Sequence, residues 1–250
     1  MGRRVPEFIR FPQPLKATRI GAMSHRGKAK KAGLKLVGWS LLGLVLLLGG
    51  GLLAAFVGSL VAAIATIIMV AWMVFAIFTV CFFRDPTPIV PTDPKAIVAP
   101  AHGKVDCIEE AEEKDFVGGK CLRISTFLSI FDVHVQNAPL AGTVSFLRHT
   151  PGQFLNAMNR ESGLRNENVL VGFESREQAG ERIAVRLIAG LIARRIVPWI
   201  VLHEVLERGE RMSLIQFGSR VDVYVPLSAK VCVNLGDRVR GGETIIARRA

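Results

Sequence analysis

The sequence predicts a β-rich α+β protein, in which a barrel- or sandwich-like domain follows two membrane-spanning helices arranged as a hairpin. Three observations lead to this prediction. No charged residue occurs in the 48 positions from Leu36 to Phe83. Four prolines then follow between positions 86 and 94. Beyond position 96, apolar and polar residues alternate in short runs bounded by Gly, Asn or Asp, which is typical of β-strands.

Residues 1–35 form a basic tail. They contain ten Lys or Arg residues and one acidic residue, Glu7, and so hold most of the net charge of +11. Basic segments beside a membrane span stay on the cytoplasmic side. Each Lys or Arg near the surface adds about 1 kcal/mol of attraction to an anionic bilayer. We therefore predict a cytoplasmic tail. It has only two Phe residues for base stacking and no recognition fold, so no nucleic acid is expected as a partner.

The uncharged run at 36–83 is too long for one crossing of a membrane. A spanning helix needs about 20 residues to cover roughly 30 Å, whereas 48 residues in one helix would extend about 72 Å. Two passes, near 36–56 and 60–83, fit better, with a turn at glycines 49–51 or at Gly58-Ser59. Two passes return the chain to the side of its tail. The following domain is therefore expected at the cytoplasmic face of the cell membrane.

A stiff connector at 84–95 is expected next, because its prolines cannot continue a helix. The domain at 96–250 is predicted to contain strands at 96–99, 103–108, 121–126, 133–135, 143–147, 169–173, 183–187, 221–225 and 244–247. Helices are expected at 189–197, ahead of Pro198, and at 155–160. The four cysteines, at 81, 107, 121 and 232, lack the CxxC spacing of zinc or redox sites, so no metal is expected.

One short motif carries chemistry of its own. Gly218-Ser219 stands at the head of an alternating strand, where a serine hydroxyl can attack the carbonyl behind it. The attack would cut the chain between 218 and 219 and leave a new amino-terminal group on Ser219. Such a group can become a pyruvoyl, a carbonyl cofactor made from the protein itself.

The chain resembles the phosphatidylserine decarboxylase proenzymes in their short, membrane-anchored bacterial form. The resemblance covers most of residues 70–250 and rests on six segments in the same order: Phe82-Phe83-Arg84-Asp85-Pro86, 99–105, 129–135, Asn166-Glu167, 189–197, and 209–211 leading to 217–222. It implies that the catalytic domain at 96–250 cuts itself. The products would be a β chain, 1–218, and an α chain, 219–250, which stay associated. A pyruvoyl derived from Ser219 would then form a Schiff base with phosphatidylserine, and loss of CO2 would yield phosphatidylethanolamine.

The same resemblance implies roles for individual side chains. His134 matches the family's histidine base, whose imidazole titrates in the useful range. Residues two apart on a strand share a face, so Asp132 is expected beside His134 as an orienting carboxylate. His102 stands where the family usually has an aspartate that partners this base. Either His102 acts as base or relay, or Asp132 compensates, or maturation is slow or absent. Arg194 and Arg195 are candidates for binding the lipid phosphate, with solvated charges as the alternative.

We therefore expect a membrane enzyme of phospholipid biosynthesis whose partner is the bilayer and its lipid substrate. A homodimer is a further partner to be tested. Two alternatives stay open. One is a maturation-defective relative that serves as a non-catalytic, membrane-bound adaptor. The other is a decarboxylase of a related seryl-phospholipid such as archaetidylserine, because those enzymes share this layout.

Overall fold

The computed structural model of the chain describes residues 28–155, 165–191, 195–216 and 219–250. It divides into two compact units between Trp72 and Met73. The expected basic tail lies almost wholly outside the described residues.

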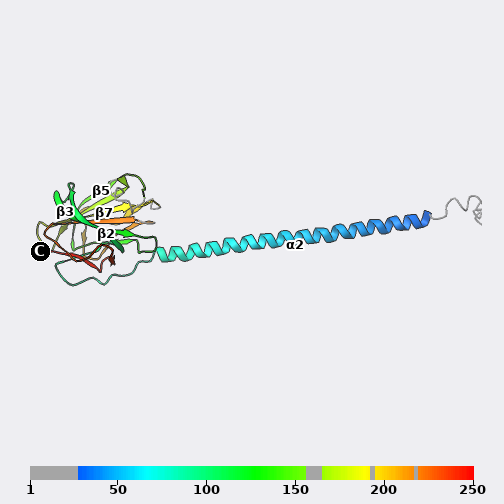
Figure 1. Ribbon diagram of the computed structural model, residues 1–250, viewed down its shortest axis with the longest axis horizontal. Coiled ribbons are helices and arrows are strands. Elements are labelled where there is room, and N and C mark those ends of the chain that lie inside the picture. The colour runs from blue at the N-terminus through cyan, green and yellow to red at the C-terminus, as the bar shows by residue number, and fades with distance from the viewer. Residues whose placement is uncertain (1–27, 156–164, 192–194, 217–218) are drawn as a thin grey trace, which may run out of the picture. The chain divides into compact units, whose positions relative to one another are not determined.

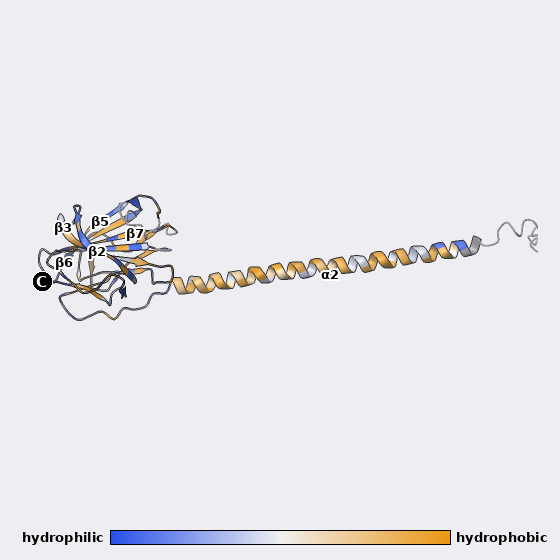
Figure 2. Ribbon diagram, in the orientation of Figure 1, coloured by the Kyte–Doolittle hydropathy of each residue, from blue (hydrophilic) through white to orange (hydrophobic). Residues whose placement is uncertain are grey.

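The first unit consists of most of one long helix, α2 (Lys28–Phe82). Figure 2 shows apolar residues along most of α2, and its part Lys31–Phe82 is the one described helix long and apolar enough to cross a membrane. The most apolar stretch of this helix has no protein cover, and Leu47, for example, is 74% exposed. Apolar surface on this scale needs another apolar phase to cover it. The helix is therefore a membrane-associated segment.

The expected helical hairpin is corrected by the structure, because α2 runs through both proposed turns without a break. Glycines 49–51 disfavour a helix by about 1 kcal/mol each relative to Ala. They bring no proline, however, and no side chain that could bond the backbone groups of a turn. At the second proposed turn, the Ser59 hydroxyl donates to the Phe56 carbonyl at 2.7 Å. That bond satisfies the serine inside the helix.

The second unit contains a curled eight-stranded antiparallel sheet, a half-barrel, with strand order β13-β2-β3-β11-β7-β6-β5-β9. This confirms the expected β-rich domain. Figure 1 labels β2, β3, β5 and β7 of this sheet. The strands in chain order are β2 (Gly103–Glu113), β3 (Gly119–Leu128), β5 (Gly142–Thr150), β6 (Asn168–Ser175), β7 (Arg182–Ala189), β9 (Val205–Leu206), β11 (Ser219–Val225) and β13 (Arg238–Val239).

Two three-stranded sheets complete the unit. One has the order β1-β14-β12, with β1 (Ala96–Val98), β12 (Lys230–Val231) and β14 (Ile245–Arg248). The other has the order β4-β10-β8, with β4 (Val135–Asn137), β8 (Ile196–Pro198) and β10 (Arg211–Ile215). Val221 and Val223 of the large sheet share one core with residues of both small sheets, such as Ala247 and Met212. We call the face of the large sheet that bears Val221 its inner face.

Two expected elements differ from the structure, and a third cannot be compared with it. The strand expected at 133–135 begins only at Val135, so His134 precedes β4. The helix expected at 189–197 is replaced by strand ends, because Ala189 closes β7 and Ile196 opens β8. Ala189 already has a backbone partner in β11, and such tertiary pairing overrides a local helical pattern. The helix expected at 155–160 falls on positions outside the described ranges, except for its first residue.

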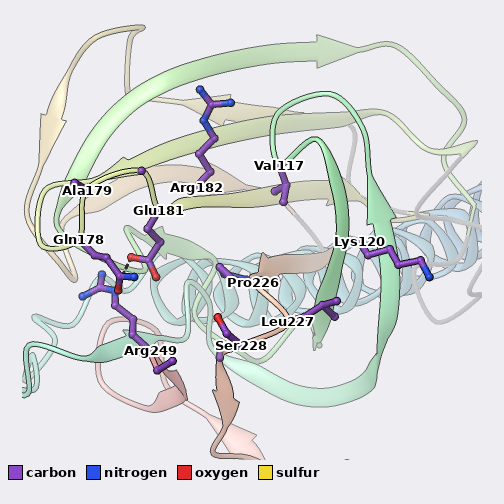
Figure 3. A pocket seen from close by; sticks show the side chains of 13 residues that line it. Val117, Lys120, Gln178, Ala179, Glu181, Arg182, Pro226, Leu227, Ser228 and Arg249 are labelled. Atoms are coloured by element: carbon purple, nitrogen blue, oxygen red, sulfur yellow. Dashed lines mark hydrogen bonds and ion pairs between the residues drawn. The ribbon is translucent and has the colours of Figure 1, made fainter.

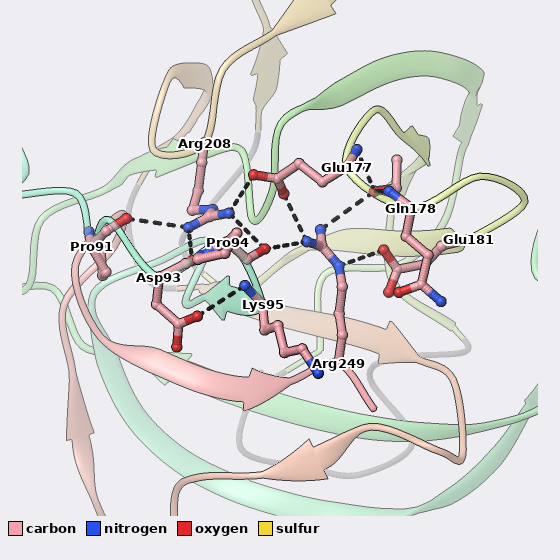
Figure 4. Close-up of polar contacts among 10 residues, drawn as sticks. Pro91, Asp93, Pro94, Lys95, Glu177, Gln178, Glu181, Arg208 and Arg249 are labelled. Atoms are coloured by element: carbon pink, nitrogen blue, oxygen red, sulfur yellow. Dashed lines mark hydrogen bonds and ion pairs between the residues drawn. The ribbon is translucent and has the colours of Figure 1, made fainter.

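The proline-rich connector at 84–95 lies along the surface of the domain. Arg208 donates to the carbonyls of Pro91 and Pro94, each at 3.2 Å (Figure 4). Arg249 also donates to the Pro94 carbonyl, at 2.6 Å. Backbone carbonyls held by charged donors have a fixed position. The connector is therefore a bound strap rather than a loose tether.

Candidate functional site

Those expected site residues that the structure describes lie towards one end of the large sheet. Because its strands are antiparallel, β2, β6 and β11 begin at this end, and β3, β5 and β7 finish there. Ser219 is the first residue of β11 and pairs with Leu128 on one side and Ala189 on the other. We call this region the 219 end.

Ser219 is fully buried at the 219 end. Its side chain lies on the inner face, because Val221 and Val223 follow it at two-residue steps on β11. The Ser219 hydroxyl has no hydrogen-bond partner among the described residues. Leaving a buried hydroxyl unsatisfied costs about 1–3 kcal/mol, and such a group calls for an explanation such as a catalytic role. Gly218 lies outside the described residues.

His134 is held as a neutral imidazole. Its ring is buried and packs on Phe82, with centroids 4.3 Å apart and planes at 32°. Its Nδ1 lies 2.9 Å from the backbone carbonyl of Asp132. A carbonyl only accepts, so Nδ1 carries the proton and Nε2 is the acceptor in the neutral ring. Burial lowers the pKa of His134, opposed by the bond and the charge of Asp132. This tautomer is suited to a base that acts through Nε2.

His134 and Ser219 belong to one site because two segments of the chain run together. Leu128 pairs with Ser219 at one end, and the Ile215 N–H donates to the His134 carbonyl at 3.2 Å at the other. Ser219 follows Ile215 by only four positions, which limits their Cα separation to about 14 Å. The fold thus brings the histidine and the serine, distant in sequence, to the same end of the sheet.

The expected role of the Asp132 carboxylate is corrected. One of its oxygens accepts from the backbone N–H and the hydroxyl of Ser129, both at 2.8 Å. The other lies 3.2 Å from Arg238. The Asp132 N–H bonds the Ser129 carbonyl at 2.9 Å, so this segment is a turn and the alternation of a strand does not apply. The residue orients His134 through its carbonyl and not through its carboxylate.

His102 lies at the same end, directly before β2. A Cβ added to Gly241 would come within 3.2 Å of the His102 ring and 2.7 Å of the Asn137 side-chain oxygen, so only glycine fits there. Burial lowers the pKa of His102, opposed by the charges of Glu243 and Asp132. Asp132 raises the pKa of His134 in the same way. Two neutral imidazoles therefore lie within the electrostatic range of one carboxylate.

Sequence reasoning missed several side chains that build this site. Phe82 covers the ring of His134, and Arg84 donates to the Phe131 carbonyl at 2.6 Å, in the turn before that histidine. Asn166 is buried and donates to the carbonyl of Ala189, the partner of Ser219, at 2.7 Å. The motifs that contain these residues were noted in the sequence, but nothing local indicates what they contact.

Of the two candidate arginines, Arg194 lies outside the described residues. Arg195 is exposed, and its carbonyl accepts from the Gln216 N–H at 3.2 Å, three residues before Ser219. It borders a hollow of about 460 Å³ at the 219 end, together with His149 and Ile196. The structure therefore places Arg195 near the proposed cleavage site.

A second hollow, of about 380 Å³, lies at the opposite end of β11, next to Pro226 (Figure 3). The seven residues of β11 put it more than about 20 Å from Ser219. It is too distant to contribute to the site described above. Within the described parts of the chain, no three His, Cys, Asp or Glu side chains gather where they could hold a metal ion.

Comparison with known proteins gives consistent matches. The sequence profile of a family described as phosphatidylserine decarboxylase matches residues 75–247. A phosphatidylserine decarboxylase proenzyme of Desulfotalea psychrophila is 45% identical over 171 residues, which are 68% of this chain and 79% of the relative. The proenzyme of Symbiobacterium thermophilum is 42% identical over 199 residues (77% and 92%), and that of Pelobacter propionicus is 40% identical over 197 residues (79% and 88%).

The matched region includes every residue of the site at the 219 end. It begins in the last turns of α2, before Phe82, and extends through β14. His102, His134 and Ser219 lie inside it.

Proposed function

Because the chain belongs to the phosphatidylserine decarboxylase family, it is a decarboxylase proenzyme, and we propose that it converts phosphatidylserine to phosphatidylethanolamine and CO2 after cutting itself between positions 218 and 219. Beyond membership of the family, one observation on this chain supports self-cleavage at this position. A buried serine hydroxyl without a described partner opens a central strand, at the sheet end that also holds a neutral histidine.

Self-cleavage is proposed to begin at Ser219. Its Oγ attacks the carbonyl carbon of Gly218, the Nε2 atom of His134 takes the hydroxyl proton, and the peptide nitrogen leaves as an amine. An ester then links the two residues. Loss of the α-proton of residue 219 expels the Gly218 carboxylate and leaves a dehydroalanine. Water then replaces the nitrogen, ammonia departs, and a pyruvoyl remains at position 219. The Nδ1–H bond to Asp132 supports this role because it keeps Nε2 as the accepting nitrogen.

A pyruvoyl carbonyl at position 219 would supply the electron sink that carbanion chemistry requires and that ordinary side chains lack. The residues around this position fit such a group. Leu128 and Ala189 bond β11 from both sides, which would hold its first residue in place after the cut. The position is buried, so access of bulk water to it would be limited. His134 can accept a proton at Nε2 and return it.

His102 is proposed to act as a proton relay for His134 during self-cleavage. It stands at the position where the family usually has an aspartate. Its support is its place directly before β2, where burial lowers its pKa and the charges of Glu243 and Asp132 oppose that effect. A His102→Asp replacement discriminates the alternatives. Faster formation of the 219–250 fragment would show that a missing carboxylate limits maturation. Slower formation would show that the imidazole has a role of its own.

The two fragments are proposed to stay associated after cleavage. In the uncut chain, β11 makes seven register pairs with β3 and six with β7. The proposed α chain, 219–250, also includes β12, β13 and β14, which pair with strands of the other fragment or with each other. These ladders would need to break together for the fragments to separate.

The catalytic domain is proposed to face the cytoplasm. The basic tail favours the cytoplasmic side. The membrane-associated segment has 52 residues, or about 78 Å of helix, more than twice the roughly 30 Å of a hydrocarbon core. That length does not require one straight crossing, so we propose that both of its ends lie on the side of the tail. Protease digestion of inside-out and right-side-out vesicles tests this orientation. Cleavage of the domain only in right-side-out vesicles would refute it.

Intact-mass measurement of the purified protein tests the function. We expect two chains, the smaller one with 32 residues and beginning at position 219, together with release of CO2 from phosphatidylserine. The Ser219→Ala variant should remain one chain and be inactive. A wild-type protein that stays uncut and inactive would favour the adaptor alternative. An active protein whose chain is intact would refute the proposed cofactor.

A further inference from the structure

The hollow of about 460 Å³ at the 219 end is a candidate binding site close to Ser219. Its volume falls within the range of small-molecule sites, about 300–1,000 Å³. Leu147, Val169, Ile196 and Pro198 form its apolar lining. Polar groups on the same lining come from Arg195, His149 and Glu167.

The pairing of the strands places this hollow close to Ser219 and on the same face of the sheet. Ser219 pairs with Ala189, whose N–H donates to the carbonyl of Glu167 at 2.9 Å. Two strand spacings therefore separate Ser219 from Glu167, a distance of about 10 Å. In the next row, Val221 pairs with Leu187, Leu187 with Val169, and Val169 with His149. Residues in one row share a face, so His149 lies on the inner face.

Among the polar groups of the hollow, Arg195 is the one that can bind an anion. His149 Nε2 lies 3.2 Å from Glu167 Oε1, and a carboxylate can only accept, so this nitrogen carries the proton. The Glu167 charge is thereby directed towards His149. Arg195 is exposed, and its side chain makes no hydrogen bond within the described ranges. Its planar set of donors matches two oxygens of a phosphate.

The size of the lipid headgroup fits this separation. Four bonds of about 1.5 Å join the amine nitrogen of a seryl phosphodiester to its phosphorus, so the two atoms lie about 5 Å apart. An amine that reaches position 219 therefore leaves its phosphate between Ser219 and the Glu167 strand. The glycerol beyond the phosphate would then meet Leu147 and Val169. A site for free phosphate alone would have no use for this apolar lining.

From these observations we propose that the hollow binds the phosphodiester and the glycerol of a seryl-phospholipid, with Arg195 on the phosphate oxygens and Leu147 and Val169 against the glycerol. The proposal rests on the proposed function, because it assigns the lipid substrate of the same site.

Calorimetric titration of sn-glycero-3-phosphoserine tests this site without cleavage or catalysis. The titrated protein carries Ser219→Ala, so it stays uncut and cannot react with the ligand. Adding Arg195→Ala should weaken binding about tenfold or more, because a charge-assisted pair is lost. Arg195→Lys should recover part of this loss. Leu147→Trp should weaken binding by filling the hollow. Arg182→Ala, which removes an exposed arginine at the far end of the sheet, should change nothing.

Inorganic phosphate provides the second arm of the titration. The proposal predicts that it binds more weakly than glycerophosphoserine and is insensitive to Leu147→Trp. Equal affinity for both ligands, with no effect of Leu147→Trp on either, would reassign the hollow to free phosphate and overturn the proposal. So would an Arg195→Ala protein that binds glycerophosphoserine as tightly as the Arg182→Ala control.

Kinetic measurements with Ser219 intact separate this proposal from the proposed function. Arg195→Ala should raise KM for phosphatidylserine about tenfold and leave formation of the 219–250 fragment unchanged. An unchanged KM would contradict the phosphate contact. Failure of the wild-type protein to cut itself or release CO2 would refute the proposed function alone, since the titration is read out from an uncut protein.

Discussion

Replacing Arg249 tests whether a buried ion pair holds the proposed 219–250 fragment in the domain. The Arg249 Nε lies 2.6 Å from Glu181 Oε2, and its Nη1 lies 2.8 Å from Glu177 Oε2 (Figure 4). The side chains of Arg249 and Glu181 are each 4% exposed. Burial acts to raise the pKa of Glu177, but Arg208 and Arg249 outweigh it and hold that pKa below its ordinary value. Both glutamates therefore depend on Arg249 for part of their charge compensation.

The expected loss of stability follows from this burial. Removing one partner of a buried ion pair leaves an uncompensated charge and costs about 3–5 kcal/mol. Arg249→Met keeps the aliphatic volume of the side chain, so the change in packing is small. For a domain of 150–250 residues, each kcal/mol lowers Tm by about 2–4 °C. We therefore expect Arg249→Met to lower Tm by about 6–20 °C.

Differential scanning calorimetry of the detergent-solubilised protein measures this shift. Arg182→Met is the matched control, because its ion pair with Glu174 is about half exposed, and such pairs contribute about 0–1 kcal/mol. The double variant Arg249→Met with Glu181→Met should recover much of the lost Tm, since it removes the unpaired carboxylate. A single variant no less stable than the control, or a double variant no more stable than the single one, would refute this reasoning.

Three further predictions concern the site itself. Burial lowers the pKa of His134, so the rate of self-cleavage, measured by mass spectrometry, should stay high just below pH 6.5. The stability of the folded protein should fall as the pH drops from about 6.5 through the lower pKa of the folded state. A half-maximal cleavage rate at or above pH 6.5 would contradict this. Phe82→Ala should destabilise the protein by about 3–5 kcal/mol and slow self-cleavage, because Phe82 packs on His134, and an unchanged cleavage rate would show that this packing is dispensable. Gly241→Ala should slow fragment formation because the new methyl crowds the ring of His102, whereas Gly119→Ala, which enters open space, should not; equal rates in both variants would reject the crowding argument.

Local patterns were sufficient for the strands and for the membrane-associated segment. Alternation located β6, β7 and β11 to within two residues of their observed ends. The uncharged run identified α2 because apolar side chains have few alternatives to a membrane at that length. The turn expected within α2 does not occur in the structure, since glycine weakens a helix without offering the chain another set of hydrogen bonds. The segment at 189–197 misled the helix prediction because its strand partners lie elsewhere in the chain.

By itself, the sequence determined the family motifs and the order of the strands along the chain, and it singled out Ser219 and His134 as candidates, because these are properties of residues and their neighbours. Only the tertiary structure decided that β11 lies between β3 and β7, and that a backbone carbonyl of Asp132 holds His134. It also decided that Arg195 borders a hollow beside Ser219. These arrangements depend on hydrogen bonds between segments far apart in sequence, and a local pattern carries no information about which distant segment will satisfy it.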